Sequence, residues 1–361
     1  MRLLPIAAPV STGVSGRSPS LAGPERTWLE RARAGDEDAY RRLVDPHRRE
    51  LHAHCYRMLG SVHDAEDALQ DALLRAWRGL ARFEGRSSLR AWLYRIATNA
   101  CLDLAARRPA RVLPQDYGPP GDPHEGPTEP LVEFAWLEPY PDERLALADG
   151  ATTPEGRYQQ REALELAFVA ALQHLPPKQR AALILREVLG FSAQEVAEAL
   201  ETTVASVKSA LQRARKAVDE RLPEESQQAT LRSLGDERLR KIVSAYIAAW
   251  ERDDVDAVVA MLTDDATIAM PPTLTWYRGR EAITTFYAEW ALSGELRWRH
   301  LSTRANGQPA VACYSWDAEH GSYAAQVLDV LTLRGHHIAE ITSFVDPQGF
   351  RRFGLPDQLS F

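Results

Sequence analysis

Apolar positions recur at helical spacing through most of the chain and change to strand-like alternation only in its last third. The most regular helical pattern lies in residues 192–217. Ser192 followed by Glu195 is a capping box, which starts a short helix, and Thr203 can cap a second helix. On that second helix the apolar residues are spaced three and four apart, which leaves a polar and basic face outward. The pattern predicts two helices joined by a tight turn.

A polar-basic helix held against a partner helix is the geometry that enters the major groove of DNA. Its outward side chains can reach base edges and phosphates. The candidate DNA-reading residues are Thr203, Val204, Ala205, Ser206, Lys208, Ser209, Gln212, Arg213, Arg215 and Lys216. An ordinary helical hairpin with a solvated basic face has the same pattern, because a helix-turn-helix motif alone is a weak signal.

Helical spacing also runs through residues 25–110, where two segments carry candidate chemistry. In residues 62–77 an apolar stripe predicts the buried face, and Asp64, Asp67 and Asp71 line up on another face. These carboxylates form either a solvated face or a surface that docks onto a basic protein. In the helix expected from residue 88, a second stripe holds Ser88, Trp92, Arg95 and Asn99. This stripe suits stacking and hydrogen bonding to unstacked bases, although Trp92 fits a core position equally well.

Several motifs together resemble a known family. The segments DAEDA at residues 64–68 and AWLYRIATN at residues 91–99 resemble region 2 of the extracytoplasmic-function sigma factors, group 4 of the sigma-70 family. The segments LPPKQR at residues 175–180 and LRE at residues 185–187, with the helix-turn-helix, resemble region 4. The two blocks cover roughly residues 25–110 and 158–222 and occur in the family's order.

The resemblance implies a bacterial RNA polymerase subunit that selects promoters, with core RNA polymerase and promoter DNA as partners. It implies that region 2 binds the polymerase and melts the −10 element, and that region 4 reads the −35 element through the helix starting at Thr203. Glu201 and Ala210 depart from the family pattern, so the promoter sequence is not transferable. The implied polymerase-binding residues are Asp64, Glu66, Asp67, Asp71, Arg75 and Trp77. The implied −10 residues are Arg86, Ser88, Arg90, Trp92, Arg95 and Asn99.

Residues 111–157 form the expected linker between these blocks, with nine prolines and ten acidic residues. Such a segment buries too little apolar surface to fold alone. An apolar island within it is typical of a docking motif, and it resembles the Trp-Leu-Pro linker motif of sigma factors with a C-terminal extension. We expect it to dock on the C-terminal domain and so to control the sigma part. The candidate docking residues are Phe134, Trp136, Leu137 and Tyr140.

Residues 236–350 extend beyond what a sigma factor needs, and their pattern predicts helices followed by an antiparallel sheet. Asn306-Gly307 is a hairpin signal between two of the strands. The segment WYRGREAI at residues 276–283 and the element order resemble the SnoaL-like, nuclear-transport-factor-like cone fold. The expected helices are 237–251, 254–263 and 279–291, and the expected strands are 267–270, 296–304, 309–317, 322–334 and 337–346.

Cone folds enclose an apolar pocket. Three interpretations stay open: a ligand-sensing regulatory domain, a purely structural docking domain, and a cyclase-like or isomerase-like enzyme tethered to a DNA-binding module. An enzyme would draw on Asp329, His300 and His320, whose spacing does not show that they converge. The candidate pocket residues are Trp250, Met270, Trp276, Tyr277, Trp290, Tyr314 and Trp316.

The composition of the chain restricts its possible functions. The net charge of −7 over 361 residues argues against a basic coat for nucleic acid, so any DNA contact is local. The three cysteines lack metal-binding spacing and fit buried thiols in a reducing cytoplasm. No apolar run approaches the ~18 residues of a membrane span, and residues 1–24 read as a disordered tail. We therefore predict a mainly α, cytoplasmic, non-enzymatic sigma factor without cofactor, metal site or membrane partner. A small-molecule ligand and an anti-sigma partner stay open.

Overall fold

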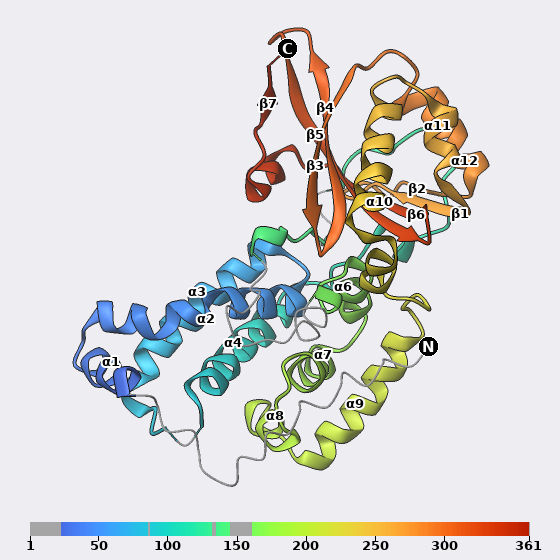
Figure 1. The fold of residues 1–361 in the computed structure, drawn as a ribbon. Coiled ribbons are helices and arrows are strands. Elements are labelled where there is room, and N and C mark those ends of the chain that lie inside the picture. The colour runs from blue at the N-terminus through green and yellow to red at the C-terminus, as the bar shows by residue number, and fades with distance from the viewer. Residues whose placement is uncertain (1–22, 86, 132–134, 145–160, 361) are drawn as a thin grey trace. The chain divides into compact units, whose positions relative to one another are not determined.

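The computed structural model describes residues 23–85, 87–131, 135–144 and 161–360, in two compact units. The N-terminal unit contains residues 1–110 and 144–223, and the C-terminal unit contains residues 111–143 and 224–361. The first unit is helical, and the second combines helices with one sheet (Figure 1). The predicted class, mainly α with an α+β C-terminal domain, is confirmed. The predicted disordered tail lies almost entirely outside the described residues.

The helices of the N-terminal unit begin where the sequence supplies capping side chains. Asp36 accepts a hydrogen bond from the Ala39 amide at the start of α2, and Ser61 accepts one from the Asp64 amide at the start of α3. Gly60 ends α2 in the left-handed conformation that glycine adopts without strain. The described α-helices are α1 Gly23–Arg33, α2 Glu37–Leu59, α3 Val62–Gly79, α4 Leu89–Ala105, α6 Leu166–Gln173, α7 Pro177–Leu183, α8 Ala193–Ala199 and α9 Val204–Asp219.

Within this unit the two helical blocks, α1–α4 and α6–α9, pack directly on each other. Arg180 of α7 is buried, and it donates to the Gln173 side chain at 2.7 Å and to the Met58 carbonyl at the end of α2. Arg57 of α2 donates to the Ala163 carbonyl at 3.0 Å. These bonds satisfy carbonyls that would otherwise be buried without partners, so they hold the blocks together.

The C-terminal unit is a curved sheet covered on one face by helices (Figure 1). The strand order is β2-β1-β6-β5-β4-β3, with β1 and β6 parallel and the other pairs antiparallel, while β7 pairs with β5. The helices are α10 Gln227–Trp250, α11 Val255–Ala260 and α12 Arg280–Phe286. The strands are β1 Leu262–Ala269, β2 Trp276–Arg278, β3 Trp298–Ala305, β4 Gln308–Asp317, β5 Ser322–Arg334, β6 His337–Phe344 and β7 Gln358–Leu359.

Most predicted elements of this unit are present, and the bounds of β5 are as predicted. Asn306 and Gly307 both have positive φ, 55° and 72°, which is the two-residue hairpin turn expected of Asn-Gly. The predicted helix 254–263 was wrong at its end, because Leu262 pairs with Ile338 as the start of β1. The sequence also missed β2, whose three residues are too few to show alternation.

The described part of the predicted linker, up to Glu143, packs as part of the C-terminal unit. The Leu131 amide donates to the Pro272 carbonyl at 2.8 Å, and the Gly121 amide donates to the Trp276 carbonyl at 2.9 Å. A proline-rich segment has few amides and no helix or sheet of its own to satisfy them. It therefore gains order by donating to the loop and strand ends of the neighbouring domain.

Candidate functional site

The helix-turn-helix forms as the sequence predicts. Ser192 and Glu195 make the reciprocal capping box of α8, and the Thr203 hydroxyl accepts from the Ser206 amide at 3.1 Å to start α9. The buried face of α9 is Val207, Leu211, Ala214 and Val218. Val204 is half-buried, and the other nine candidate DNA-reading residues from Thr203 to Lys216 are exposed. The turn places Glu201 at a φ of +52°, a left-handed conformation in which glycine is less strained.

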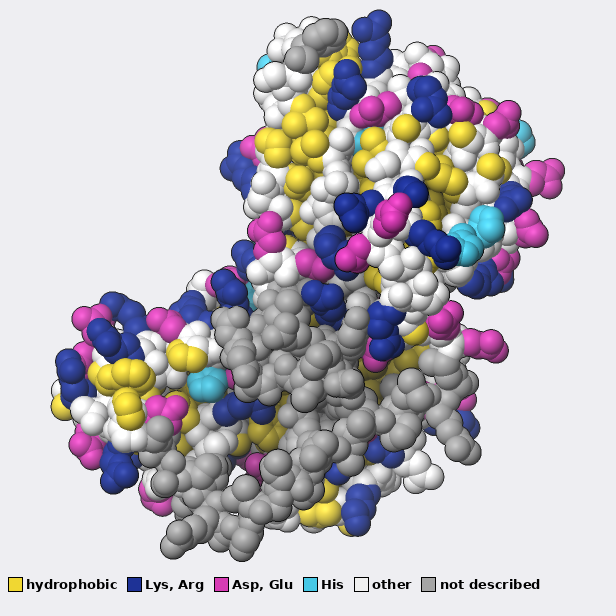
Figure 2. Space-filling view, in the orientation of Figure 1, with side chains coloured by type: hydrophobic (Ala, Val, Ile, Leu, Met, Phe, Trp, Pro, Cys, Tyr) yellow, Lys and Arg dark blue, Asp and Glu magenta, His cyan; other side chains and the backbone are white. Residues whose placement is uncertain are grey.

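The basic side chains of α9 differ in how they are held. Arg215 is bound to Glu187 at 2.5 Å, and Arg213 donates to the Ser209 hydroxyl at 2.7 Å. Lys216 lies near Glu220 at 3.9 Å. Figure 2 shows acidic and basic side chains interspersed over the visible surface of both units. An electrostatic contact with DNA therefore has to be local, as the net charge indicated.

The acidic face of α3 is smaller than predicted, because Asp64 is buried. Its side chain is 3% exposed and pairs with Arg108. The helical period alone did not show this, since Arg108 follows 44 residues later. Asp67 is exposed, and Arg75 bridges Asp71 and Asp103 at 2.7 Å each.

The outward surface of α3 also includes two further predicted residues, Glu66 and Trp77, and one residue that was not predicted, Leu74. Glu66 is partly exposed and lies 3.3 Å from Arg144. Trp77 packs edge-on against Tyr40, at 4.9 Å between ring centroids. Leu74 is 56% exposed, one turn from Asp71. Leu74 was not among the residues predicted from the sequence, and an apolar residue just outside the predicted buried stripe was the available signal.

Within the −10 candidates, Arg90 has structural partners. Its Nε donates to Glu50 at 3.1 Å, and its guanidinium lies 4.7 Å from the centre of the Tyr94 ring and 5.2 Å from that of Phe191. Ser88 is the N-cap of α4 and accepts from the Ala91 amide at 3.1 Å. Arg90 therefore contacts Glu50 and Tyr94 of its own block and Phe191 of the other block, and its role at the −10 element stays a prediction. Arg86 lies outside the described residues.

The remaining three candidates lie on α4. Trp92 is half-buried and packs on Phe83 with 4.9 Å between ring centroids, so part of its side chain has a structural role. Arg95 is exposed and Asn99 is half-buried on the same helix. The structure thus leaves one cationic and one amide side chain accessible beside an aromatic edge.

The C-terminal unit contains an apolar cavity of about 390 Å³ that is partly open to the surface. Of the predicted pocket residues, Trp250, Met270 and Trp290 line it. Trp276, Tyr277, Tyr314 and Trp316 are not among the residues that line it. On β4 the odd positions Val311 and Cys313 lie in the core that surrounds the cavity. Strand alternation puts Tyr314 and Trp316 on the other face, where Tyr314 packs on Phe350 and Trp316 on Tyr323.

The three residues that an enzyme would use do not come together. Asp329 lines the cavity, whereas His320 is exposed and bound to Asp317 at 2.7 Å. His300 is buried beside Trp250, with 5.7 Å between ring centroids, and is not part of the cavity lining. Burial lowers the pKa of His300 to about 4, so its ring is neutral at physiological pH.

Three of the candidate docking residues pack closely on their surroundings, and Phe134 lies outside the described residues. Trp136 donates to the Leu131 carbonyl at 2.8 Å and packs on Tyr117. Tyr140 is fully buried, and its backbone amide donates to the Asn306 side chain at 2.8 Å. Leu137 is also buried.

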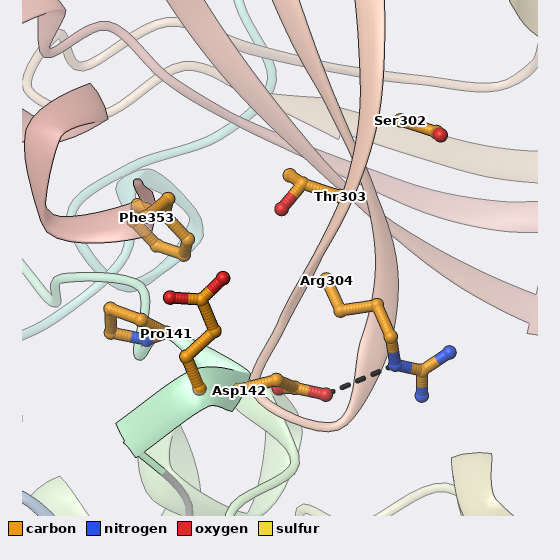
Figure 3. Close-up of a pocket in the computed structure, with 7 residues that line it drawn as sticks. Pro141, Asp142, Ser302, Thr303, Arg304 and Phe353 are labelled. Atoms are coloured by element: carbon orange, nitrogen blue, oxygen red, sulfur yellow. Dashed lines mark hydrogen bonds and ion pairs between the residues drawn. The ribbon is translucent and has the colours of Figure 1, made fainter. Parts of the chain in front are cut away.

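The next residues, Pro141 and Asp142, extend this contact along the β3–β4 hairpin. The Asp142 carboxylate accepts from the Gly307 amide at 2.7 Å and from Arg304 at 3.1 Å. Figure 3 shows Asp142 and Arg304 paired beside a pocket of about 310 Å³, with Phe353 across from them. The linker is therefore held on the C-terminal unit by contacts with the Asn306-Gly307 turn.

Comparisons with known proteins cover all three parts of the chain. The family model "Sigma-70 region 2" matches residues 43–111, "Sigma-70, region 4" matches residues 165–218, and "SnoaL-like domain" matches residues 243–341. The chain is 42% identical to the ECF RNA polymerase sigma factor SigG of Mycobacterium tuberculosis over 339 residues, which is 91% of this chain and 86% of that protein. It is 31% identical over 195 residues, or 54% of this chain, to 94% of the ECF RNA polymerase sigma factor SigW of Bacillus subtilis.

A solved structure shares the fold over most of the chain. The crystal structure of the Mycobacterium tuberculosis ECF sigma factor SigJ superposes with a TM-score of 0.53 at 23% identity, and the match covers 86% of this chain and 97% of that one. No described helix is both long and apolar enough to cross a membrane. The relatives are sigma factors rather than enzymes, so the interpretation as a tethered cone-fold enzyme is not favoured. The chain belongs to the ECF sigma factors of RNA polymerase and carries a fused SnoaL-like C-terminal domain.

Proposed function

We propose that this sigma factor brings core RNA polymerase to its promoters by reading the −35 element with α9 and the −10 element with α4, acting in the cytoplasm. The observation that carries the proposal is the outward face of α9, where polar and basic side chains are exposed over a fully apolar inner face. A helix of this kind can enter the major groove while α8 supports it from behind.

We expect single −35 positions to be read by Lys208 and Gln212, which are exposed near the middle of α9. Replacing either by alanine removes a base contact, so preference at one or two positions should relax by roughly 1–3 kcal/mol. Lys216 is the matched control, because replacing a phosphate-binding lysine at the end of the helix weakens binding to every sequence alike. Binding to a library of randomised −35 elements measures both effects. Unchanged preferences in the Lys208 and Gln212 variants would exclude α9 as the reader.

The −10 element is proposed to be captured by Arg95 and Asn99 beside the Trp92 edge. Stacking on an aromatic side chain contributes about 1–3 kcal/mol per base, enough to decide whether a short segment stays open. Arg95→Ala and Asn99→Ala should therefore keep polymerase binding and lower open-complex formation. Permanganate reactivity of the −10 thymines measures the open state. Wild-type reactivity in both variants would make this face structural. Arg78→Ala is a control, since Arg78 is exposed but belongs to α3 rather than α4.

Core polymerase is proposed to bind the outward stripe of α3, where Asp67, Asp71 and Leu74 follow one another by about one turn. Accessible carboxylates around an apolar side chain suit a basic partner surface, in which the apolar residue supplies contact area and the charges supply orientation. Glu66, Arg75 and Trp77 border this stripe. Asp64 is excluded from the contact because Arg108 already neutralises it.

The C-terminal unit is proposed to regulate the sigma part through the linker. The support is the anchoring of Tyr140 and Asp142 on the β3–β4 hairpin, which ties the linker to the C-terminal unit just before residue 144. A contact on a short tether needs little intrinsic affinity, because the effective concentration is in the millimolar range. A partner such as an anti-sigma protein, or a ligand of the cavity, can therefore shift it.

A further inference from the structure

The basic side chains of α9 are not equally available to DNA. Lys208, Gln212 and Arg215 are spaced four and three residues apart, so they lie on one face of the helix. Lys208 is exposed and forms no ion pair with the residues that the structure describes. Lys216 is 81% exposed and lies 3.9 Å from Glu220, so water and salt screen that pair. Arg215 differs from both lysines, because a carboxylate from another element binds it directly.

That carboxylate belongs to Glu187 in the π-helical turn η4 Ile184–Val188. The Leu189 amide donates to the Ile184 carbonyl at 3.0 Å, which is the wide turn of a π-helix, a form frequent at functional sites. The Glu187 side chain is only 19% exposed, and its Oε1 accepts from the Arg215 guanidinium at 2.5 Å. The Arg215 side chain is 49% exposed, so it stays within reach of a nucleic acid.

A phosphate that approaches Arg215 also approaches the carboxylate of Glu187. On the free side of the guanidinium, a phosphate lies roughly 4 Å from the positive charge and roughly 8 Å from the carboxylate, so repulsion offsets about half of the attraction. A partly exposed ion pair contributes little to stability. The main consequence of this pair is therefore for the charge of the DNA-reading face rather than for the folding of the block.

We propose that Glu187 neutralises Arg215 and so withholds one phosphate contact from the DNA-reading face of α9. The number of neutralised phosphates sets the sequence-independent part of DNA binding. Glu187 thus lowers the affinity of the chain for DNA of any sequence, and the chain depends more on core polymerase to reach its promoters. Glu187 acts through Arg215 rather than by contacting DNA, and the inference rests on the proposed reading of the −35 element by α9.

The test is the salt dependence of promoter binding by the holoenzyme assembled from core polymerase and the full-length chain, followed by fluorescence anisotropy. Each phosphate contact contributes about 0.9 to the slope of log affinity against log salt, or roughly a three- to four-fold loss of affinity between 50 and 200 mM salt. With Glu187 present, Arg215→Gln should change the slope by less than about 0.3. In the Glu187→Gln background, where the amide keeps the shape and an acceptor, the same substitution should reduce the slope by about 0.9.

Two further variants are controls. Lys216→Gln removes the proposed phosphate-binding lysine and should reduce the slope by about 0.9 in the otherwise wild-type chain. Glu220→Gln removes an exposed carboxylate of α9 and leaves the pair of Glu187 and Arg215 in place. Arg215→Gln should therefore keep its small effect in the Glu220→Gln background.

A reduction of about 0.9 by Arg215→Gln in the wild-type chain would show that Arg215 contacts phosphate despite Glu187, and would overturn the inference. Equal effects of Arg215→Gln with Glu187 and with Gln at that position would overturn it as well. An unchanged slope in all variants, Lys216→Gln included, would instead overturn the reading of DNA by α9. A normal effect of Lys216→Gln keeps that role intact, whichever result Arg215 gives.

Discussion

Replacing Phe191 by alanine is expected to raise transcription by the purified sigma factor with core polymerase. Phe191 belongs to the α6–α9 block and packs on Tyr94 of α4 with 5.4 Å between ring centroids, and Arg90 lies over its ring. These contacts occur only while the two helical blocks are together. The −35 and −10 elements are about 25 base pairs apart, roughly 85 Å along B-DNA at 3.4 Å per base pair.

The closed N-terminal unit cannot reach both elements. Its longest described helix, the 23-residue α2, extends only about 35 Å, and α4 contacts both α7 and α8. We therefore expect initiation to require separation of the two blocks, which their contact opposes. Weakening the contact by 1–2 kcal/mol should raise the open fraction roughly 5- to 30-fold while the closed state dominates.

A second variant on the other block separates opening from local damage, since Phe191 also precedes the N-cap of α8. Arg57→Met keeps the apolar stem and removes the hydrogen bond to the Ala163 carbonyl across the same contact. Both variants should transcribe more than wild type, at matched concentrations of folded protein, and should exchange the amides of α4 and α8 faster. Wild-type or lower transcription in both, with normal folding, would show that the closed arrangement does not restrain initiation.

Asn306→Gly is expected to release the linker from the C-terminal unit without disturbing the hairpin. Glycine adopts the positive φ of this turn readily, and the backbone bond from the residue 306 amide to the Tyr140 carbonyl can remain. The substitution removes the side-chain acceptor of the Tyr140 amide, which should cost about 1–3 kcal/mol. Hydrogen exchange over residues 135–142 should accelerate accordingly, and transcription should differ from wild type.

Asn306→Asp is the matched control, because its carboxylate still accepts from the Tyr140 amide and tolerates the same turn. Asp142→Ala removes the neighbouring anchor to Gly307 and Arg304, and should change transcription in the same direction as Asn306→Gly. If exchange accelerates while Asn306→Gly and Asp142→Ala both transcribe like wild type, the linker anchor has no regulatory role. If exchange stays unchanged in Asn306→Gly, the side chain does not hold the linker.

Local features were predictable from the sequence because their causes lie within a few residues. The Ser192–Glu195 box and the Thr203 cap define α8 and α9 through bonds three residues apart. The Asn306-Gly307 turn forms because this pair adopts two successive positive φ angles. The apolar spacing on α9 determined which of its faces is buried, and with it the ten candidate DNA-reading residues. The family assignment rested on such local motifs.

Only the tertiary structure decided features that depend on distant partners. Asp64 has the helical spacing of an exposed residue. It is buried in an ion pair with Arg108, which lies 44 residues later in the sequence. The proline-rich linker lacks a pattern of its own, and it becomes ordered on strands and loops more than a hundred residues away. The sequence does not distinguish which aromatic residues in the last third of the chain line the cavity, because all of them are apolar. Which of them line the cavity depends on the face of the sheet on which strand alternation and helix packing place each ring, so Trp250 and Trp290 contribute to it and Trp316 does not.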